Sequence, residues 1–128
     1  MRLALIGFGE VGTIFATDFI ARGASVATYD ILFDDRERRE AYLGKARSVG
    51  AIAGKDARSA CADAEIVISA VTASAAEEVA TAAGGYLAPG QVFFDINSAA
   101  PATKQRSARA FAVGGAQYVE GAVMAPVP

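Results

Sequence analysis

The segment Gly7-Phe8-Gly9-Glu10-Val11-Gly12 decides the fold of this chain, because it sets three glycines at the spacing G-x-G-x-x-G. It directly follows an apolar run, residues 3–6, and directly precedes a stretch with helical periodicity. In that position Gly7 permits a tight turn, Gly9 lets a pyrophosphate approach the backbone and Gly12 allows close packing. Free N–H groups at the helix start would bind the phosphates. We predict that all six residues contact a dinucleotide; a glycine-rich turn that serves only packing is the alternative.

The residues behind the glycines predict an amphipathic helix. Small or apolar residues recur at the spacing i, i+3, i+4 and i+7, at Gly12, Phe15, Ala16 and Phe19. This face is expected to lie on a sheet, and Gly23 is expected to end the helix. The glycine loop therefore joins a strand to a helix, as a phosphate-binding turn requires.

An acidic residue follows the second predicted strand, residues 25–29. Asp30 lies 23 positions after Gly7, close to the spacing of about 20 residues at which an acid binds the adenosine ribose. We place Asp30 and its neighbour Tyr29 in the cofactor site. A carboxylate there accepts the ribose hydroxyls and repels a 2′-phosphate, so NAD is the expected cofactor.

NADP stays open because arginines follow closely. The arginines are Arg36, Arg38 and Arg39. If residues 31–35 fold back, one of them could reach a phosphate, although pairing with Glu37 or Glu40 is the simpler role.

The rest of the chain repeats the strand–helix alternation, which predicts a parallel sheet with crossover helices. The expected strands are residues 2–6, 25–29, 51–53, 66–70, 92–95 and 117–119. The fold class is therefore α/β, a Rossmann-type doubly wound and mainly parallel sheet with helices on both faces, in one domain over residues 1–128.

Three local patterns predict where helices begin. The charged segment 34–49 predicts a solvated helix that opens with acidic residues. Ser74 with Glu77 fits a capping box directly after the fourth strand. Pro101 can open the helix after the fifth strand.

Composition narrows the function class. A formal net charge of -2 argues against a nucleic-acid binder. The apolar runs are too short to span a membrane and no signal peptide is recognised, so a cytoplasmic protein without membrane partners is expected. With no histidine and one cysteine, the chain offers no metal cluster, no disulfide and no histidine base. Cys61, among alanines, is interpreted as a packing residue.

Three segments in this order resemble the N-terminal domain of the β-hydroxyacid dehydrogenases, the family of 3-hydroxyisobutyrate and 6-phosphogluconate dehydrogenases. They are the glycine loop, E-I-V-I-S-A-V-T at 65–72 and D-I-N-S-A-A-P at 95–101. The resemblance implies that Val71 and Thr72 lie along the cofactor. It also implies that Ser98 lies near the nicotinamide ribose and the substrate, whereas without the family match Ser98 would simply start a helix.

Residues 118–126 resemble the family's substrate loop, usually D-A-P-V-S-G-G. The resemblance implies that Val123 and Met124 contact substrate. Met124, Ala125 and Pro126 replace Ser-Gly-Gly, so the substrate's identity does not carry over.

The family's catalytic lysine lies on the helix that enters a second, helical domain, and no residue of 1–128 matches it. Lys45, Lys55 and Lys104 are interpreted as surface lysines, so no catalytic residue is assigned. We expect a full-length homodimer, formed through the absent C-terminal domain, that transfers hydride between a β-hydroxyacid or phosphogluconate-like substrate and NAD(P). A dinucleotide sensor or regulatory module is the alternative, and an S-adenosylmethionine-dependent methyltransferase fits the glycine spacing less well.

Overall fold

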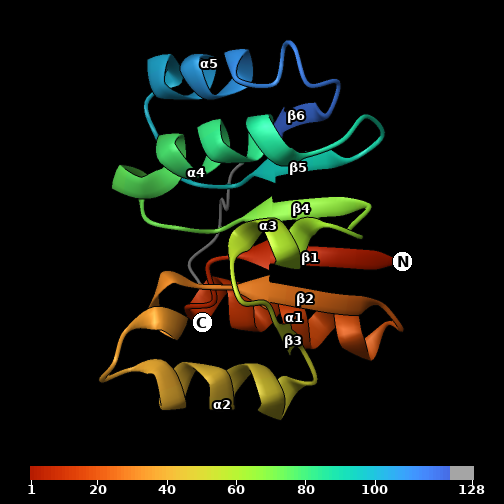
Figure 1. The fold of residues 1–128 in the computed structure, drawn as a ribbon, viewed down its shortest axis with the longest axis vertical. Coiled ribbons are helices and arrows are strands. Elements are labelled where there is room, and N and C mark those ends of the chain that lie inside the picture. The colour runs from red at the N-terminus through yellow and green to blue at the C-terminus, as the bar shows by residue number, and fades with distance from the viewer. Residues whose placement is uncertain (122–128) are drawn as a thin grey trace.

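The computed structural model describes residues 1–121 as an alternation of strands and helices (Figure 1). The strands are β1 Arg2–Ile6, β2 Ser25–Tyr29, β3 Ile52–Ala53, β4 Ile66–Ser69, β5 Val92–Asp95 and β6 Gln117–Glu120. The helices are α1 Glu10–Ala21, the 3₁₀ helix η1 Ile31–Asp34, α2 Arg39–Val49, α3 Ala57–Cys61, α4 Ala73–Tyr86 and α5 Pro101–Arg109. None of the helices in this part of the chain is long and apolar enough to cross a membrane.

All six strands pair in parallel in one sheet, in the order β3-β2-β1-β4-β5-β6. Figure 1 shows β6 at the top and β3 at the bottom of this stack. The register aligns the carboxyl ends of the five longer strands, at Tyr29, Ile6, Ser69, Asp95 and Glu120. Loops that leave these ends therefore meet along one edge, where ligands of such sheets bind.

Two hydrophobic cores lie on opposite faces of the sheet, because neighbouring strand residues point to opposite sides. Leu3 and Leu5 of β1 pack in the core that includes Ala16 of α1 and Ala46 of α2. The other face carries the core of α3 and α4, formed by Ala4, Ile6, Cys61, Ala80 and Ala83 among others. Helices thus cover both faces, and the predicted doubly wound α/β class is confirmed.

Two of the predicted helix boundaries are confirmed. Gly23 has φ +93° just after α1, a left-handed conformation that suits glycine and ends the helix. Pro101 is the first residue of α5, where its missing N–H removes no helical hydrogen bond.

Cys61 is fully buried, and burial raises the pKa of its thiol to about 12. It is the packing residue expected.

One predicted helix start and one predicted helix cap are wrong. α2 begins at Arg39 rather than at residue 34, because the Asp35 carboxylate accepts the N–H groups of Glu37 and Arg38 and holds them in a turn. α4 does follow β4, but its N-cap is Thr72 and its first residue Ala73. Ser74 therefore lies inside the first turn and forms no capping box.

Candidate cofactor site

The glycine loop between β1 and α1 is closed tightly at two of its three glycines. Gly7 has φ +95° and donates its N–H to the carbonyl of Tyr29 at 2.9 Å. A Cβ at Gly7 would lie 2.1 Å from the oxygen of Ala70, and one at Gly12 would lie 2.3 Å from the oxygen of Gly7. Side chains are excluded at both positions by backbone atoms. The tight turn and the close packing expected of these glycines are therefore present.

Gly9 differs, because a Cβ there would meet no atom within 4 Å. Packing does not explain this glycine, whose backbone faces open space at the N-cap of α1. The first N–H groups of a helix have no partner within the helix and carry partial positive charge. The loop therefore offers an open, electropositive backbone surface that fits the pyrophosphate of a dinucleotide.

The other loop residues face different surroundings. The side chain of Phe8 is fully buried, so only its backbone can face a ligand. Glu10 is exposed in the first turn of α1, and Val11 is half-buried at the edge of the cleft described below.

Asp30 joins the glycine loop to the end of β2. Its half-buried carboxylate accepts the N–H of Phe8 at 2.7 Å through one oxygen and the N–H of Leu32 at 2.9 Å through the other. Each carboxylate oxygen can accept more than one hydrogen bond, so both retain capacity for ribose hydroxyls.

Tyr29 contributes its backbone rather than its phenol to this region. The hydroxyl donates to the carboxylate of Asp34, and the ring packs edge-on against Phe33. Burial, and then the hydrogen bond to Asp34, raise the pKa of Tyr29 to about 12.

A cleft of about 260 Å³ opens at the carboxyl ends of the strands. It lies beside the point where the strand order reverses, since the chain proceeds from β1 to β2 and β3 on one side and to β4 on the other. Dinucleotides bind at such switch points. The lining residues are Val11, Ala70, Val71, Ala73, Ile96, Asn97 and Ser98.

The structure brings together most of the residues predicted from sequence. Val71 and the exposed Ser98 line the cleft from the ends of β4 and β5. Ser98 does not start a helix, because the N-cap of α5 is Ala100. Thr72 is exposed beside the cleft, at the N-cap of α4. The predicted substrate residues Val123 and Met124 lie outside the described residues.

The interpretation of Lys104 as a surface lysine is wrong. Only 8% of this residue is exposed, and its Nζ lies 3.0 Å from the carbonyl oxygen of Asp95 and 3.3 Å from Oδ1 of the same residue. A lysine stem is long enough to bury its methylenes while the ammonium reaches a partner. Lys104 shares the inner face of α5 with Ser107, three residues later, and this spacing is the signal that the sequence offered.

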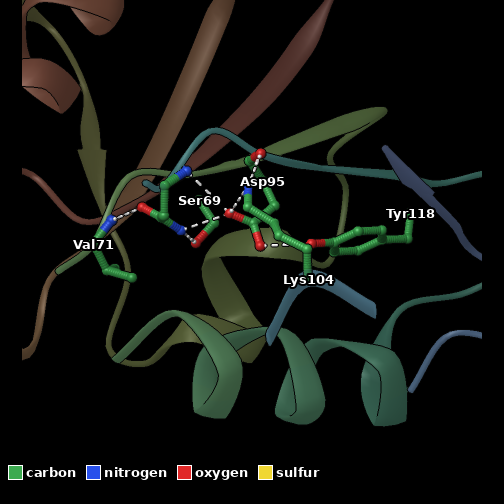
Figure 2. Close-up of polar contacts among 6 residues, drawn as sticks. Ser69, Val71, Asp95, Lys104 and Tyr118 are labelled. Atoms are coloured by element: carbon green, nitrogen blue, oxygen red, sulfur yellow. Dashed lines mark hydrogen bonds and ion pairs between the residues drawn. The ribbon is translucent and has the colours of Figure 1, made fainter. Parts of the chain in front are cut away.

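Asp95 is the centre of a buried polar network (Figure 2). Its Oδ1 accepts hydrogen bonds from the backbone and side-chain nitrogens of Asn97 and from Lys104, and its Oδ2 accepts one from the Tyr118 hydroxyl at 2.7 Å. Burial, followed by the hydrogen bond to Asp95, raises the pKa of Tyr118, so this hydroxyl stays a donor at neutral pH. Sequence reasoning missed Asn97, Asp95 and Tyr118 as partners.

Residues 2–125 match the family model described as the NAD binding domain of 6-phosphogluconate dehydrogenase. The chain belongs to this family. The resemblance read from the three sequence segments is confirmed. The chain is thus an NAD(P)-binding domain of the hydroxyacid dehydrogenase-like oxidoreductases.

No curated protein matches the chain. Several solved structures do, and they agree with the family assignment. A conserved hypothetical protein from Sinorhizobium meliloti 1021 is 38% identical with a TM-score of 0.93, over 100% of this chain and 43% of that one. An imine reductase from Aspergillus terreus, solved with NADPH4, is 26% identical with a TM-score of 0.80, and the match covers 98% of this chain and 42% of that one. A 3-hydroxyisobutyrate dehydrogenase from Mycobacterium tuberculosis shares the fold at 18% identity and a TM-score of 0.85, over 98% and 41%. The chain spans less than half the length of these proteins.

Proposed function

We propose that this domain holds the nicotinamide dinucleotide of an oxidoreductase that transfers hydride between NAD(P) and a β-hydroxyacid or a phosphogluconate-like substrate. The open backbone at Gly9 is the observation that carries the proposal, because neither packing nor backbone strain accounts for a glycine there. The cleft at the switch point is lined by Val11 of the same loop, two residues after Gly9. The bound nicotinamide would accept or donate the hydride.

The chain's own residues bind and orient in this proposal. The backbone of residues 7–12 holds the pyrophosphate, and Asp30 accepts the hydroxyls of the adenosine ribose. Val71 and Thr72 border the dinucleotide, and Ser98 contacts the nicotinamide ribose and the substrate. Family membership and the position of Val71 and Ser98 on the cleft support these roles.

We propose NAD as the preferred cofactor, because Asp30 sets a negative charge where NADP carries its 2′-phosphate. NADP remains the alternative, since Arg36, Arg38 and Arg39 are exposed nearby in sequence and the imine reductase was solved with NADPH4. Parallel titrations of the protein with NADH and NADPH, followed by nicotinamide fluorescence, test the choice. A lower Kd for NADPH would reverse it.

We also propose that the base for proton transfer lies outside residues 1–121. Lys104, the most buried lysine of this part of the chain, is held beneath α5 by Asp95 and does not line the cleft. Substrate contacts by Val123 and Met124, and a homodimer formed through a helical C-terminal domain, complete the proposal by analogy with the family. Spectral assay of hydroxyacid oxidation in a Lys104→Met variant tests the first point. Because Lys104 supports the site through Asp95, we expect a higher KM for the dinucleotide with turnover per folded protein retained at saturating dinucleotide, whereas complete loss of turnover in the folded variant would identify Lys104 as the base.

A further inference from the structure

We propose that Asn97 is a positioning residue for the dinucleotide, because it orients the Ala70–Val71 peptide that lies against the glycine loop. The inference rests on the proposed function. Asn97 is only 5% exposed and lies two residues after the end of β5.

The orientation of the Asn97 amide is fixed by its partners. Nδ2 lies 3.0 Å from Ser69 Oγ and 2.9 Å from Asp95 Oδ1. An ionised carboxylate only accepts hydrogen bonds, so the amide nitrogen and not the oxygen must face Asp95. The amide oxygen Oδ1 therefore faces the backbone N–H of Val71, at 2.7 Å.

The bond to Val71 carries the orientation on to the glycine loop. The N–H of Val71 and the carbonyl of Ala70 belong to one trans peptide, and in a trans peptide these groups point in opposite directions. Asn97 holds the N–H, and the carbonyl oxygen abuts Gly7, where it occupies the place of a Cβ. A single planar group thus spans from the end of β5 to the first glycine of the loop.

The network behind Asn97 has a rigid base. Lys104 of α5 and Tyr118 of β6 hold the carboxylate of Asp95 from the side away from Val71 (Figure 2). A buried carboxylate that is paired and fully hydrogen-bonded has little freedom to move. The amide of Asn97 is therefore held in a fixed position, and it fixes the Ala70–Val71 peptide in turn.

The same side chain also links residues that line the cleft. Val71, Asn97 and Ser98 all line it. Because Asn97 bonds Val71 directly, the position of Val71 relative to Ser98 depends on one carboxamide. Loss of that carboxamide would leave the Ala70–Val71 peptide free to rotate and the loop less well positioned for phosphate.

Gln91 offers a matched control at the opposite end of β5. Its carboxamide also makes three hydrogen bonds between loops, donating to the carbonyls of Cys61 and Ala64 and accepting the N–H of Ala88. It is distant from the cleft, which lies at the carboxyl ends of the strands. Gln91→Ala therefore removes a similar set of bonds without touching the Ala70–Val71 peptide.

The experiment measures the affinity of the chain for NAD⁺ and NADP⁺ by calorimetry, together with Tm, in the wild type, Asn97→Ala and Gln91→Ala. We expect Asn97→Ala to weaken binding about tenfold, as the loss of one hydrogen bond to the site's backbone predicts. Gln91→Ala should lower Tm and leave affinity within about twofold. Equal affinities in the wild type and Asn97→Ala, or equal losses in both variants, would overturn the inference. A wild type that binds neither dinucleotide would instead refute the proposed function.

A second variant keeps the inference testable if Asn97→Ala does not fold. Asn97→Asp retains an oxygen for the Val71 N–H but turns a second carboxylate toward Asp95, with Lys104 and Tyr118 as the other titratable groups facing the pair. Two adjacent carboxylates share a proton at low pH and repel when both are ionised. The affinity of this variant should therefore be higher at about pH 5.5 than at about pH 8. A pH profile identical to that of the wild type would contradict a positioning role.

Discussion

Replacing Gly9 by valine should abolish dinucleotide binding and leave the fold intact. Gly9 has φ −78° and ψ −152°, which any residue can adopt, and a Cβ there would meet no protein atom within 4 Å. The branched side chain would therefore stand in the space that the pyrophosphate needs and nowhere else. The structural cost is limited to a poorer N-cap, about 0.5–1 kcal/mol.

Gly7→Ala provides the contrast. An alanine at φ +95° costs about 1–2 kcal/mol in backbone strain. Its Cβ would in addition lie 2.1 Å from the Ala70 oxygen, which only a backbone shift can relieve. We expect Gly7→Ala to unfold at a clearly lower temperature and Gly9→Val to unfold close to the wild type.

Thermal unfolding with and without NADH separates the two effects. A ligand at about one hundred times its Kd stabilises the native state by about 2.7 kcal/mol, or roughly 10 °C for a domain of this size. The wild type should show this rise, whereas Gly9→Val should show none. A Gly9→Val protein that gains as much Tm from NADH as the wild type would refute the assignment of the phosphate site.

Three further predictions concern single side chains. Asp30→Ala should reduce the preference for NADH over NADPH, because it removes both the ribose acceptor and the charge that repels a 2′-phosphate; the ratio of the two Kd values measures this, and a wild type that prefers NADPH would contradict it. Lys104→Met should lower the free energy of unfolding by about 3–5 kcal/mol in urea, since Asp95 would be left buried without its cation, whereas the exposed Lys55→Met should change it little. Cys61 should resist thiol reagents in the folded protein, because burial raises the pKa of its thiol from 9.0 to about 12. Its contribution to the free energy of unfolding should be lost as the pH rises from 9.0 toward 12, because the unfolded state releases the proton first. Rapid labelling of the native protein would show instead that the thiol is accessible.

The strands and the glycine loop could be predicted from sequence because their signals are local. Apolar runs such as residues 66–70 have the length and composition of buried parallel strands. Gly12 is required by a contact within the loop, and Gly7 by its own positive φ in the turn. Such features depend on residues that lie near one another in the chain, and the printed sequence contains them.

The buried network could not be predicted because it joins distant segments. The bond from Val71 to Asn97 spans 26 residues and that from Tyr118 to Asp95 spans 23. Because lysine is rarely buried, the residue type alone predicts an exposed Lys104, and only the three-residue spacing to Ser107 points to the inner face of α5. The predicted start of α2 is wrong for a different reason, because Asp35 can hold the following N–H groups equally well in a turn or at a helix start.

The buried ring of Phe8 has a consequence for anyone who transfers this loop to another protein. The G-x-G-x-x-G pattern leaves position 8 unspecified, yet here that side chain is fully enclosed in the core with Leu5, Ala16 and Ile68. Removing a buried phenylalanine ring costs about 3–5 kcal/mol. A graft that copied only the three glycines would reproduce the backbone turn but not the buried ring that holds it in place. The recipient would also need a phenylalanine at this position and an apolar pocket beneath the turn to receive it.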